Sequence, residues 1–280
     1  MKRRILGGVA VWALLFGTAY AADITLKTQG ASVPAAAQNW SGFYVGATLG
    51  GSWADPSENY SIFQSAVFGG PPFASIALTS SRSLVSVNGG LQQGYNWQLN
   101  NGMLVGIEAD FQGSSRHSDT FVTGMSDPVA GVVATIKNDN GPDWFGTVRG
   151  RFGGIFGNWV VYETGGLAYG RVIANGSALP STGANPFTNT PYVWNQSAIH
   201  VGWTLGAGAE YAFGSRWTAK IEYLYVDLGS LTSSVSGGLN NCLGAPGLAG
   251  CNGPLPTGAF GSVTTKFTDN IIRLGVNYRM

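Results

Sequence analysis

Hydrophobic and polar positions alternate strictly along several stretches of this chain. In the clearest one, residues 199–213 (IHVGWTLGAGAEYAF), every odd-numbered residue is apolar, whereas the even-numbered residues up to 210 are His, Gly, Thr, Gly, Gly and Glu. This alternation predicts a β-strand, because successive side chains of a strand point to opposite faces. The stretch is long for a strand of a soluble sheet, where about five or six residues are usual.

Seven other stretches follow the same pattern, the one at 159–171 least cleanly, so we predict eight strands. They cover residues 42–53, 84–98, 105–112, 144–152, 159–171, 199–213, 217–225 and 271–280. Three of the connections are short turns, at 99–102, 157–158 and 214–216, and four are long, at about 54–82, 113–142, 172–197 and 229–264. Soluble domains rarely carry four long unstructured loops. Short turns on one rim and long loops on the other are typical of a membrane barrel.

Aromatic residues gather at both ends of the predicted strands, as in the two girdles of a membrane barrel. Those near the short turns or chain termini are Phe43, Tyr95, Trp97, Trp159, Tyr211, Phe213, Trp217 and Tyr278; those near the long loops are Trp53, Phe111, Trp144 and Tyr225. A soluble lipocalin-like barrel would instead turn its apolar face inward around a ligand. The face that carries the charges is too rich in glycine to suit a solvated outer surface. We therefore predict an all-β fold, an eight-stranded antiparallel transmembrane β-barrel with four long extracellular loops and short periplasmic turns.

The N-terminus carries an export signal. Lys2, Arg3 and Arg4 precede an apolar run that is shorter than the roughly 20 residues of a spanning helix, and Ala19-Tyr20-Ala21 matches a cleavage site. We expect a signal peptide at residues 1–21, a short periplasmic tether at 22–38 and the barrel at 39–280.

Composition narrows the choice of partners and of compartment. Charged residues make up 10% of the chain, against about 25% in soluble proteins. Without the three bases of the signal, 12 of the 15 Lys and Arg remain against 14 Asp and Glu, which gives no electrostatic case for binding nucleic acid. The two cysteines, Cys242 and Cys251, belong to an exported chain and suggest one disulfide.

Several motifs together resemble one protein family. They are NWSGFYVGATLGGSW, GYNWQ, DWFGTVRGRFG, TGGLAYG, VGWTLGAGAEYAF, KIEYLYVDLG and NIIRLGVNYRM, and they resemble the alphaproteobacterial outer-membrane immunogenic proteins, small surface antigens often described as porin-like. The resemblance covers the strands of the mature chain and implies an OmpA-type barrel in the cell outer membrane. It implies outer-membrane lipid and the barrel-assembly machinery as partners. The chain departs from the family at its end, where Met280 stands in place of an aromatic residue, usually Phe.

The alternation places ten charged residues inside the predicted barrel. The acids are Glu108, Asp110, Glu163, Glu210 and Glu222, and the bases are Arg149, Arg151, Lys220, Arg273 and Arg279. They could form a path for protons or ions, or a salt-bridged plug. The interior of an eight-stranded barrel is just wide enough for side chains to fill, and unpaired charges there would cost several kcal/mol each, which favours the plug. We expect the acids at 108 and 110 to pair with the arginines at 149 and 151, and the arginines at 273 and 279 to reach Lys220 and Glu222.

Catalysis and cofactor binding have little support. His117 and His200 lack a Cys or carboxylate cluster with metal-ligand spacing, and Gly206-Ala207-Gly208 continues a strand instead of opening a helix. We expect no enzyme, no cofactor and no metal site. Residues 68–78 and 185–194 are apolar and nearly uncharged, so they could contact a partner, or pack together or extend the strands above the membrane.

These features predict a monomeric structural barrel of the outer membrane, which supports envelope integrity and presents loops outside. One alternative is a narrow porin-like channel for small solutes. Another is loop-mediated binding of an apolar ligand, such as haem, or of a host surface.

Overall fold

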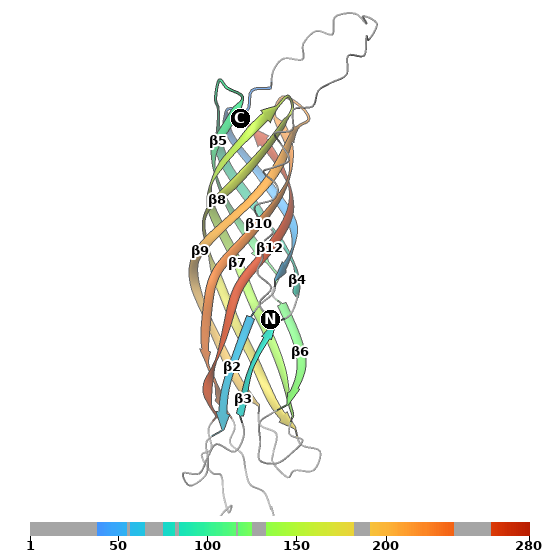
Figure 1. The fold of residues 1–280 in the computed structure, drawn as a ribbon. Coiled ribbons are helices and arrows are strands. Elements are labelled where there is room, and N and C mark those ends of the chain that lie inside the picture. The colour runs from blue at the N-terminus through green and yellow to red at the C-terminus, as the bar shows by residue number, and fades with distance from the viewer. Residues whose placement is uncertain are drawn as a thin grey trace, which may run out of the picture. The chain divides into compact units, whose positions relative to one another are not determined.

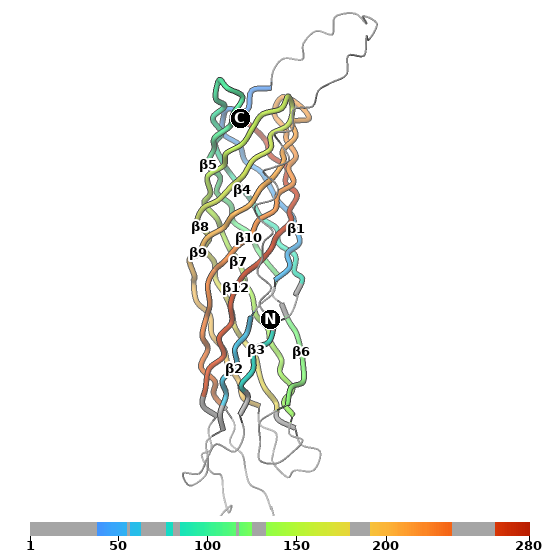
Figure 2. The backbone as a smooth tube through the Cα atoms, viewed as in Figure 1, coloured from blue at the N-terminus to red at the C-terminus, as the bar shows by residue number. Residues whose placement is uncertain are grey.

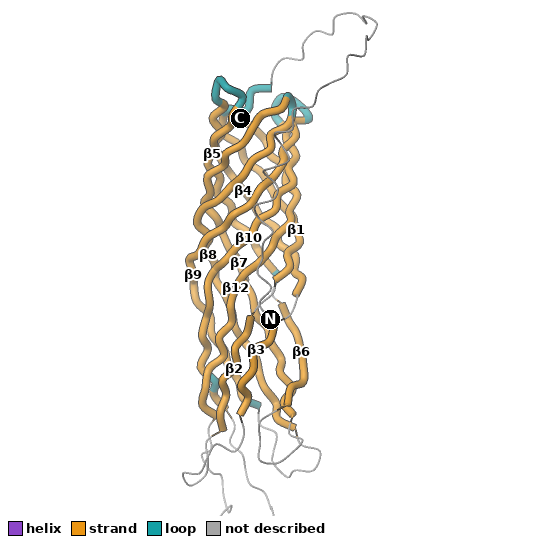
Figure 3. Tube along the Cα trace, viewed as in Figure 1, coloured by secondary structure: helices purple, strands orange, loops and turns teal. Residues whose placement is uncertain are grey.

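The computed structural model describes residues 38–54, 57–64, 75–81, 84–115, 117–124, 133–181, 191–237 and 259–280. These residues form strands and connecting turns (Figure 3). No helix in this part of the chain is long and apolar enough to cross a membrane. The expected signal peptide, nearly all of the tether, and Cys242 and Cys251 lie outside the described residues.

Eight long strands close into a barrel. They are β1 (Gly42–Ala54), β4 (Leu84–Gln98), β5 (Met103–Ser114), β7 (Val133–Phe156), β8 (Trp159–Ser181), β9 (Tyr192–Ala212), β10 (Trp217–Ser234) and β12 (Ala259–Arg279). Each pairs antiparallel with the next in this order, and β12 pairs back to β1 from Tyr44↔Arg279 to Trp53↔Asn270 (Figure 1). The predicted eight-stranded antiparallel barrel is confirmed.

Shorter strands continue the wall at the end opposite the C-terminus. β2 (Ser57–Gln64) follows β1 along β12 in the same register, since Trp53 faces Asn270 and Glu58 faces Thr265. β3 (Ser75–Ser81) pairs with β2, and β6 (His117–Gly124) with β7 (Figure 2). β11 (Ser236–Gly237) pairs with β9. The prediction of unstructured loops is therefore wrong for these segments. Residues 75–78 and 192–194 instead extend the strands, which was one of the two alternatives.

The opposite rim is made of short turns. Residues 99–102 join β4 to β5, Gly157 and Asn158 join β7 to β8, and residues 213–216 join β9 to β10. Gly102 and Gly157 take left-handed backbone angles, with φ of 78° and 63°, which glycine adopts at no steric cost. The short turns and the C-terminus lie together at this end (Figure 3).

The outward face carries the apolar residues of the alternation. On β12 the outward residues are Ile272, Leu274 and Val276, followed beyond this band by Asn270 and Lys266. Aromatic rings contact one another at both ends of the apolar band. The contacting pairs near the short turns are Tyr95–Trp97, Trp159–Tyr211 and Trp217–Tyr278, and those at the other end are Trp53–Tyr223, Phe111–Trp144 and Trp203–Tyr225. An apolar belt between two aromatic girdles is the surface that a bilayer requires.

The interior is filled in layers. An apolar cluster lies toward the short turns: Trp40, Leu104, Val160, Tyr162 and Ala212. The next layer consists of buried charges, described below. Beyond it lies a second apolar cluster that includes Phe145, Val226, Phe267 and Ile271, and the extended wall encloses a third around Tyr60, Tyr192 and Trp194.

Glycine makes room for aromatic rings inside the wall. A Cβ on Gly208 would lie 2.6 Å from the Tyr162 hydroxyl oxygen of the adjacent strand, and one on Gly94 would overlap the Tyr44 hydroxyl. Both tyrosine rings therefore rest on neighbouring glycines, which explains why the inward face is rich in glycine.

Candidate functional site

Eight of the ten charged residues predicted for the interior meet in one network. The inward positions of β5 supply two acids, β7 two arginines, β9 one acid, β10 a lysine and an acid, and β12 an arginine. The members are Glu108, Asp110, Arg149, Arg151, Glu210, Lys220, Glu222 and Arg273, each at most 5% exposed. Four acids thus face four bases, so the network has no formal net charge.

Glu108 lies at the centre of the network and is fully buried. Its carboxylate contacts Arg149 of the neighbouring strand. Lys220, which comes from the far side of the barrel, places its Nζ 2.9 Å from the same carboxylate. Arg151 and Arg273 approach to 3.5 and 3.7 Å. Since β5 and β10 are not adjacent in the wall, the contact with Lys220 crosses the lumen.

Two further acids tie opposite walls together. Glu222 lies 2.6 Å from an Arg273 nitrogen on the adjacent strand and 3.2 Å from Arg149 across the lumen. Asp110 on β5 accepts from Arg149 at 3.0 Å and from Arg273 at 2.9 Å. The arginine planes therefore span the interior and leave their charges paired from both sides.

Glu210 forms the part of the network nearest the short turns. Arg151 donates to it at 2.6 Å, and the Thr218 hydroxyl and the Asn277 amide donate to its other oxygen at 2.5 and 2.9 Å. Asn277 also accepts from Gln92 of β4. With these polar side chains, β4 also contributes to the closed interior.

Two of the ten residues lie elsewhere. Glu163 is exposed on the outer face of β8, because its neighbours Tyr162 and Thr164 are the buried, inward residues. The prediction that Glu163 faces the interior was wrong. It took this single acidic residue as the marker of a polar face, although both faces of the stretch carry apolar residues. Arg279 points inward, but it lies six residues beyond Arg273 on the same strand, and this spacing corresponds to about 20 Å.

Arg279 instead closes the rim at the short turns. It donates to the carbonyl oxygens of Asn39 and Ser215, the latter at 2.8 Å, and its guanidinium lies 5.1 Å from the Trp40 ring centre. The expected contact between Arg279 and Glu222 or Lys220 is therefore wrong. Trp40 is completely buried in the apolar cluster at this end.

Sequence reasoning missed two tyrosines of the network. Tyr44 on β1 donates to Glu108 at 2.7 Å and accepts from Arg151 at 2.7 Å. Tyr162 on β8 donates to Glu222 at 2.9 Å, and its ring centre lies 3.9 Å from the Arg151 guanidinium. The glycines opposite each ring were the available signal, because they mark where a large side chain lies along the wall.

Metal ligands do not gather in the described part of the chain. No group of three or more His, Cys, Asp or Glu residues there could hold a metal ion. His200 forms a hydrogen bond through Nδ1 with the Leu228 carbonyl oxygen at 2.9 Å. The side chain of His117 lies outside the description.

Comparison with known proteins gives consistent matches. Residues 24–279 match a family described as outer membrane protein beta-barrel domain. The 31 kDa outer-membrane immunogenic protein of Brucella melitensis is 37% identical over 236 residues, which cover 82% of this chain and 88% of that protein. The 22 kDa outer membrane protein of Rhizobium leguminosarum is 28% identical over 148 residues, 53% of this chain and 56% of that protein. Among solved structures, OprG from Pseudomonas aeruginosa is 14% identical with a TM-score of 0.42, covering 87% of this chain and 98% of that chain.

Proposed function

Because the chain belongs to the outer-membrane β-barrel family that includes the Brucella 31 kDa immunogenic protein, we propose that it is a closed, non-conducting barrel of the cell outer membrane. In this proposal its role is structural. The barrel supports the envelope and holds the long connections outside as a surface antigen.

The observation that carries the proposal is the network across the lumen. Lys220 meets Glu108, Arg149 meets Glu222, and Arg273 meets Asp110, each pair joining strands that are not neighbours in the wall. Apolar clusters lie on both sides of these charges. An ion would have to break desolvated pairs and then pass two apolar layers, and either step is costly.

Conductance tests this proposal. The refolded protein, inserted into a planar bilayer, is expected to give no sustained current at moderate voltage. Stable ohmic steps from the unmodified protein would overturn the proposal and favour the narrow diffusion channel. A refolded porin in the same bilayer serves as the positive control for insertion and recording.

The wall beyond the membrane supports a role at the cell surface. β2, β3 and β6 continue the barrel there, and their interior is packed around Tyr60 and Trp194. We propose that a ligand or host surface, if one binds, does so at the long connections.

Assembly and chemistry complete the proposal. Met280 follows directly after the last strand, β12, and is exposed, and we propose that the barrel-assembly machinery inserts the chain through this strand. The four buried carboxylates of the network are all paired with bases, which suits a structural network better than catalysis. The proposed role therefore includes no enzymatic activity.

A further inference from the structure

The wall of the barrel opens between β9 and β10. The two strands pair as far as Asp227↔Trp203, and β11 resumes the pairing with β9 at Val193. Between these contacts, residues 194–202 of β9 pair with β8 on one side and with no described strand on the other. We call this segment the open edge. The structure describes the chain continuously on both sides of the opening, over residues 191–237.

A β-bulge in β10 explains the opening. The pairing of β10 with β12 shifts in register between Asp227 and Ser230, and Gly229 between them has a φ of 78°. A bulge bends its strand and changes the direction in which it runs. β10 stays paired with β12 but turns toward the interior, where the Ser233 hydroxyl donates to the Ala174 carbonyl oxygen of β8 at 3.4 Å. β10 therefore passes beneath β9 instead of beside it.

Solvent exposure follows the opening. Inward residues of β9 near its two ends are buried, since Trp194 and Thr204 are each 2% exposed. Gln196 also takes an inward position, yet it is exposed, and Ala198 and His200 are half-buried. The inner face of β9 is thus uncovered where β10 has left it.

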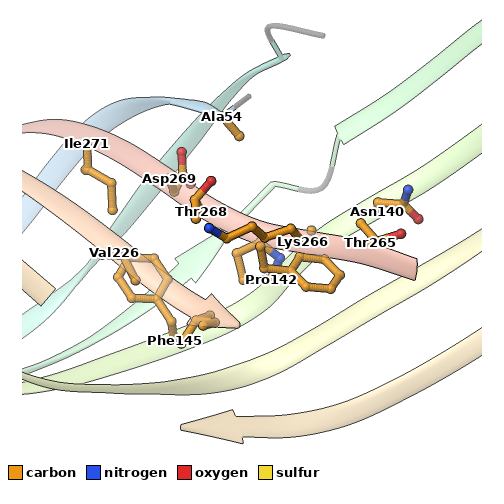
Figure 4. Close-up of a pocket in the computed structure, with 13 residues that line it drawn as sticks. Ala54, Asn140, Pro142, Phe145, Val226, Thr265, Lys266, Thr268, Asp269 and Ile271 are labelled. Carbon is orange, nitrogen blue, oxygen red and sulfur yellow. The ribbon is translucent and has the colours of Figure 1, made fainter. Parts of the chain in front are cut away.

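The opening does not lead into a passage through the lumen. His200 Nδ1 forms a hydrogen bond with the Leu228 carbonyl oxygen, and Leu228 lines a pocket inside the barrel together with Phe145 and Val226 (Figure 4). The volume of this pocket, about 30 Å³, holds only a few water molecules. What the opening makes accessible is therefore the edge of β9 itself.

The open edge presents a row of backbone donors and acceptors. In an antiparallel sheet the N–H and C=O groups of alternate residues point to the same side, so about four residues of this segment face the opening. A strand of another polypeptide is the ligand that complements such a row. The outward side chains along the edge carry no charge: Asn195 and Ser197 are polar, and Ile199 and Val201 are apolar. They favour an uncharged segment that is polar toward the outside and apolar toward the membrane.

We propose that the open edge binds an extended, uncharged segment of a partner protein at the cell surface by strand addition. A second copy of this chain is a poorer fit. Copies in one membrane are related by an axis along the membrane normal, and strands tilted by about 35–45° then cross instead of lying antiparallel. The inference goes beyond the structural role: it adds a site on the wall to the connections and leaves the lumen closed.

Amide hydrogen exchange tests whether the edge is open. It is followed by NMR on the full mature protein in lipid nanodiscs. Alternate amides of residues 195–198 should exchange at least about tenfold faster than those of residues 172–175, which lie opposite them in β8 and are paired on both sides. Equal protection would mean that the chain covers its own edge and would overturn the proposal. Protection that grows with protein concentration would assign the edge to a second copy and would overturn it as well.

A peptide of alternating valine and serine, as long as the open edge, is the binding probe. It should slow the exchange of the same alternate amides. Its N-methylated form has no backbone donors and should bind at least about tenfold more weakly, which corresponds to the loss of about 1.4 kcal/mol. Equal binding of the two peptides, or slowed exchange only elsewhere in the protein, would overturn the proposal.

Two adjacent proline variants locate the contact. Ser197→Pro and Ala198→Pro are matched, because adjacent residues of a strand direct their amides to opposite sides. Proline on the open side should weaken peptide binding about tenfold and leave the barrel folded, whereas proline on the β8 side removes a hydrogen bond of the sheet and should destabilise the protein. An equal effect of both variants on peptide binding would overturn the proposal. If the destabilised variant fails to fold, the other variant and the two peptides still decide.

Discussion

The substitution Glu108→Gln tests the energetic role of the network. Glu108 is fully buried, contacts Arg149 and Lys220, and accepts a hydrogen bond from Tyr44. Glutamine keeps the volume and can still form hydrogen bonds, but it removes one of the four negative charges. The remaining four bases then face three acids in a desolvated space.

The expected loss follows from burial. Breaking a fully buried ion pair by removing one partner costs about 3–5 kcal/mol, because the other charge is left uncompensated. Asp143→Asn is the matched control: it breaks a pair with Arg171 in which the atoms are 3.9 Å apart and the side chains 43% and 48% exposed. Exposed pairs of this kind contribute about 0–1 kcal/mol.

Urea-induced unfolding of the protein refolded into lipid vesicles provides the measurement. The folded fraction is read from the mobility of unheated samples in SDS gels, because a closed barrel migrates differently from the boiled chain. A double variant, Glu108→Gln with Lys220→Met, restores neutrality and should recover part of the lost stability. If Glu108→Gln destabilises no more than Asp143→Asn, the network does not stabilise the closed interior and the reasoning fails.

Three further predictions concern Asp269, the terminus and the cysteines. Burial raises the pKa of Asp269 from 3.8 to about 7, so its proton is bound more tightly in the folded than in the unfolded protein. This contribution to the free energy of unfolding is complete below about pH 4 and is lost as the pH rises through 7. In urea unfolding across this range, Asp269→Asn should abolish the loss of stability. If the variant keeps the pH profile of the parent, the role given to Asp269 is wrong. Met280→Phe should insert at least as efficiently as the parent, and a markedly lower surface yield would contradict the role given to this terminus. Thiol labelling of unreduced, denatured protein should leave Cys242 and Cys251 unlabelled, whereas two labelled cysteines would exclude the disulfide.

Alternation predicts the barrel well because lipid and a narrow lumen impose opposite requirements on adjacent residues. Arg149 and Arg151 could be placed inside from the sequence, since Val148 and Phe152 on the same strand are clearly apolar and face outward. Glu163 shows where the rule fails. In its stretch the inward residues, Val160 and Tyr162, are themselves apolar or aromatic, so polarity no longer distinguishes the two faces.

Alternation gives the face of a residue but not its position along the barrel axis. Arg273 and Arg279 share the inward face of β12, yet one joins the network and the other contacts backbone carbonyls at the rim. The partner of each depends on strand tilt and register, which only the pairing of whole strands determines. Contacts across the lumen, such as Lys220 with Glu108, depend on the same geometry.

The polarity rule also reverses where the strands leave the membrane. Within the lipid band, Ile199 and Val201 of β9 point outward, but farther along the same strand Tyr192 and Trp194 are buried inside. Water replaces lipid on the outer face there, so the extension packs its apolar side chains inward as a soluble barrel does. Asp269 lies near this reversal: the bases of the network end below it and the apolar layer begins around it. A carboxylate in that position lies beyond the compensation that the bases of the network provide, and this is the physical reason why burial raises the pKa of Asp269.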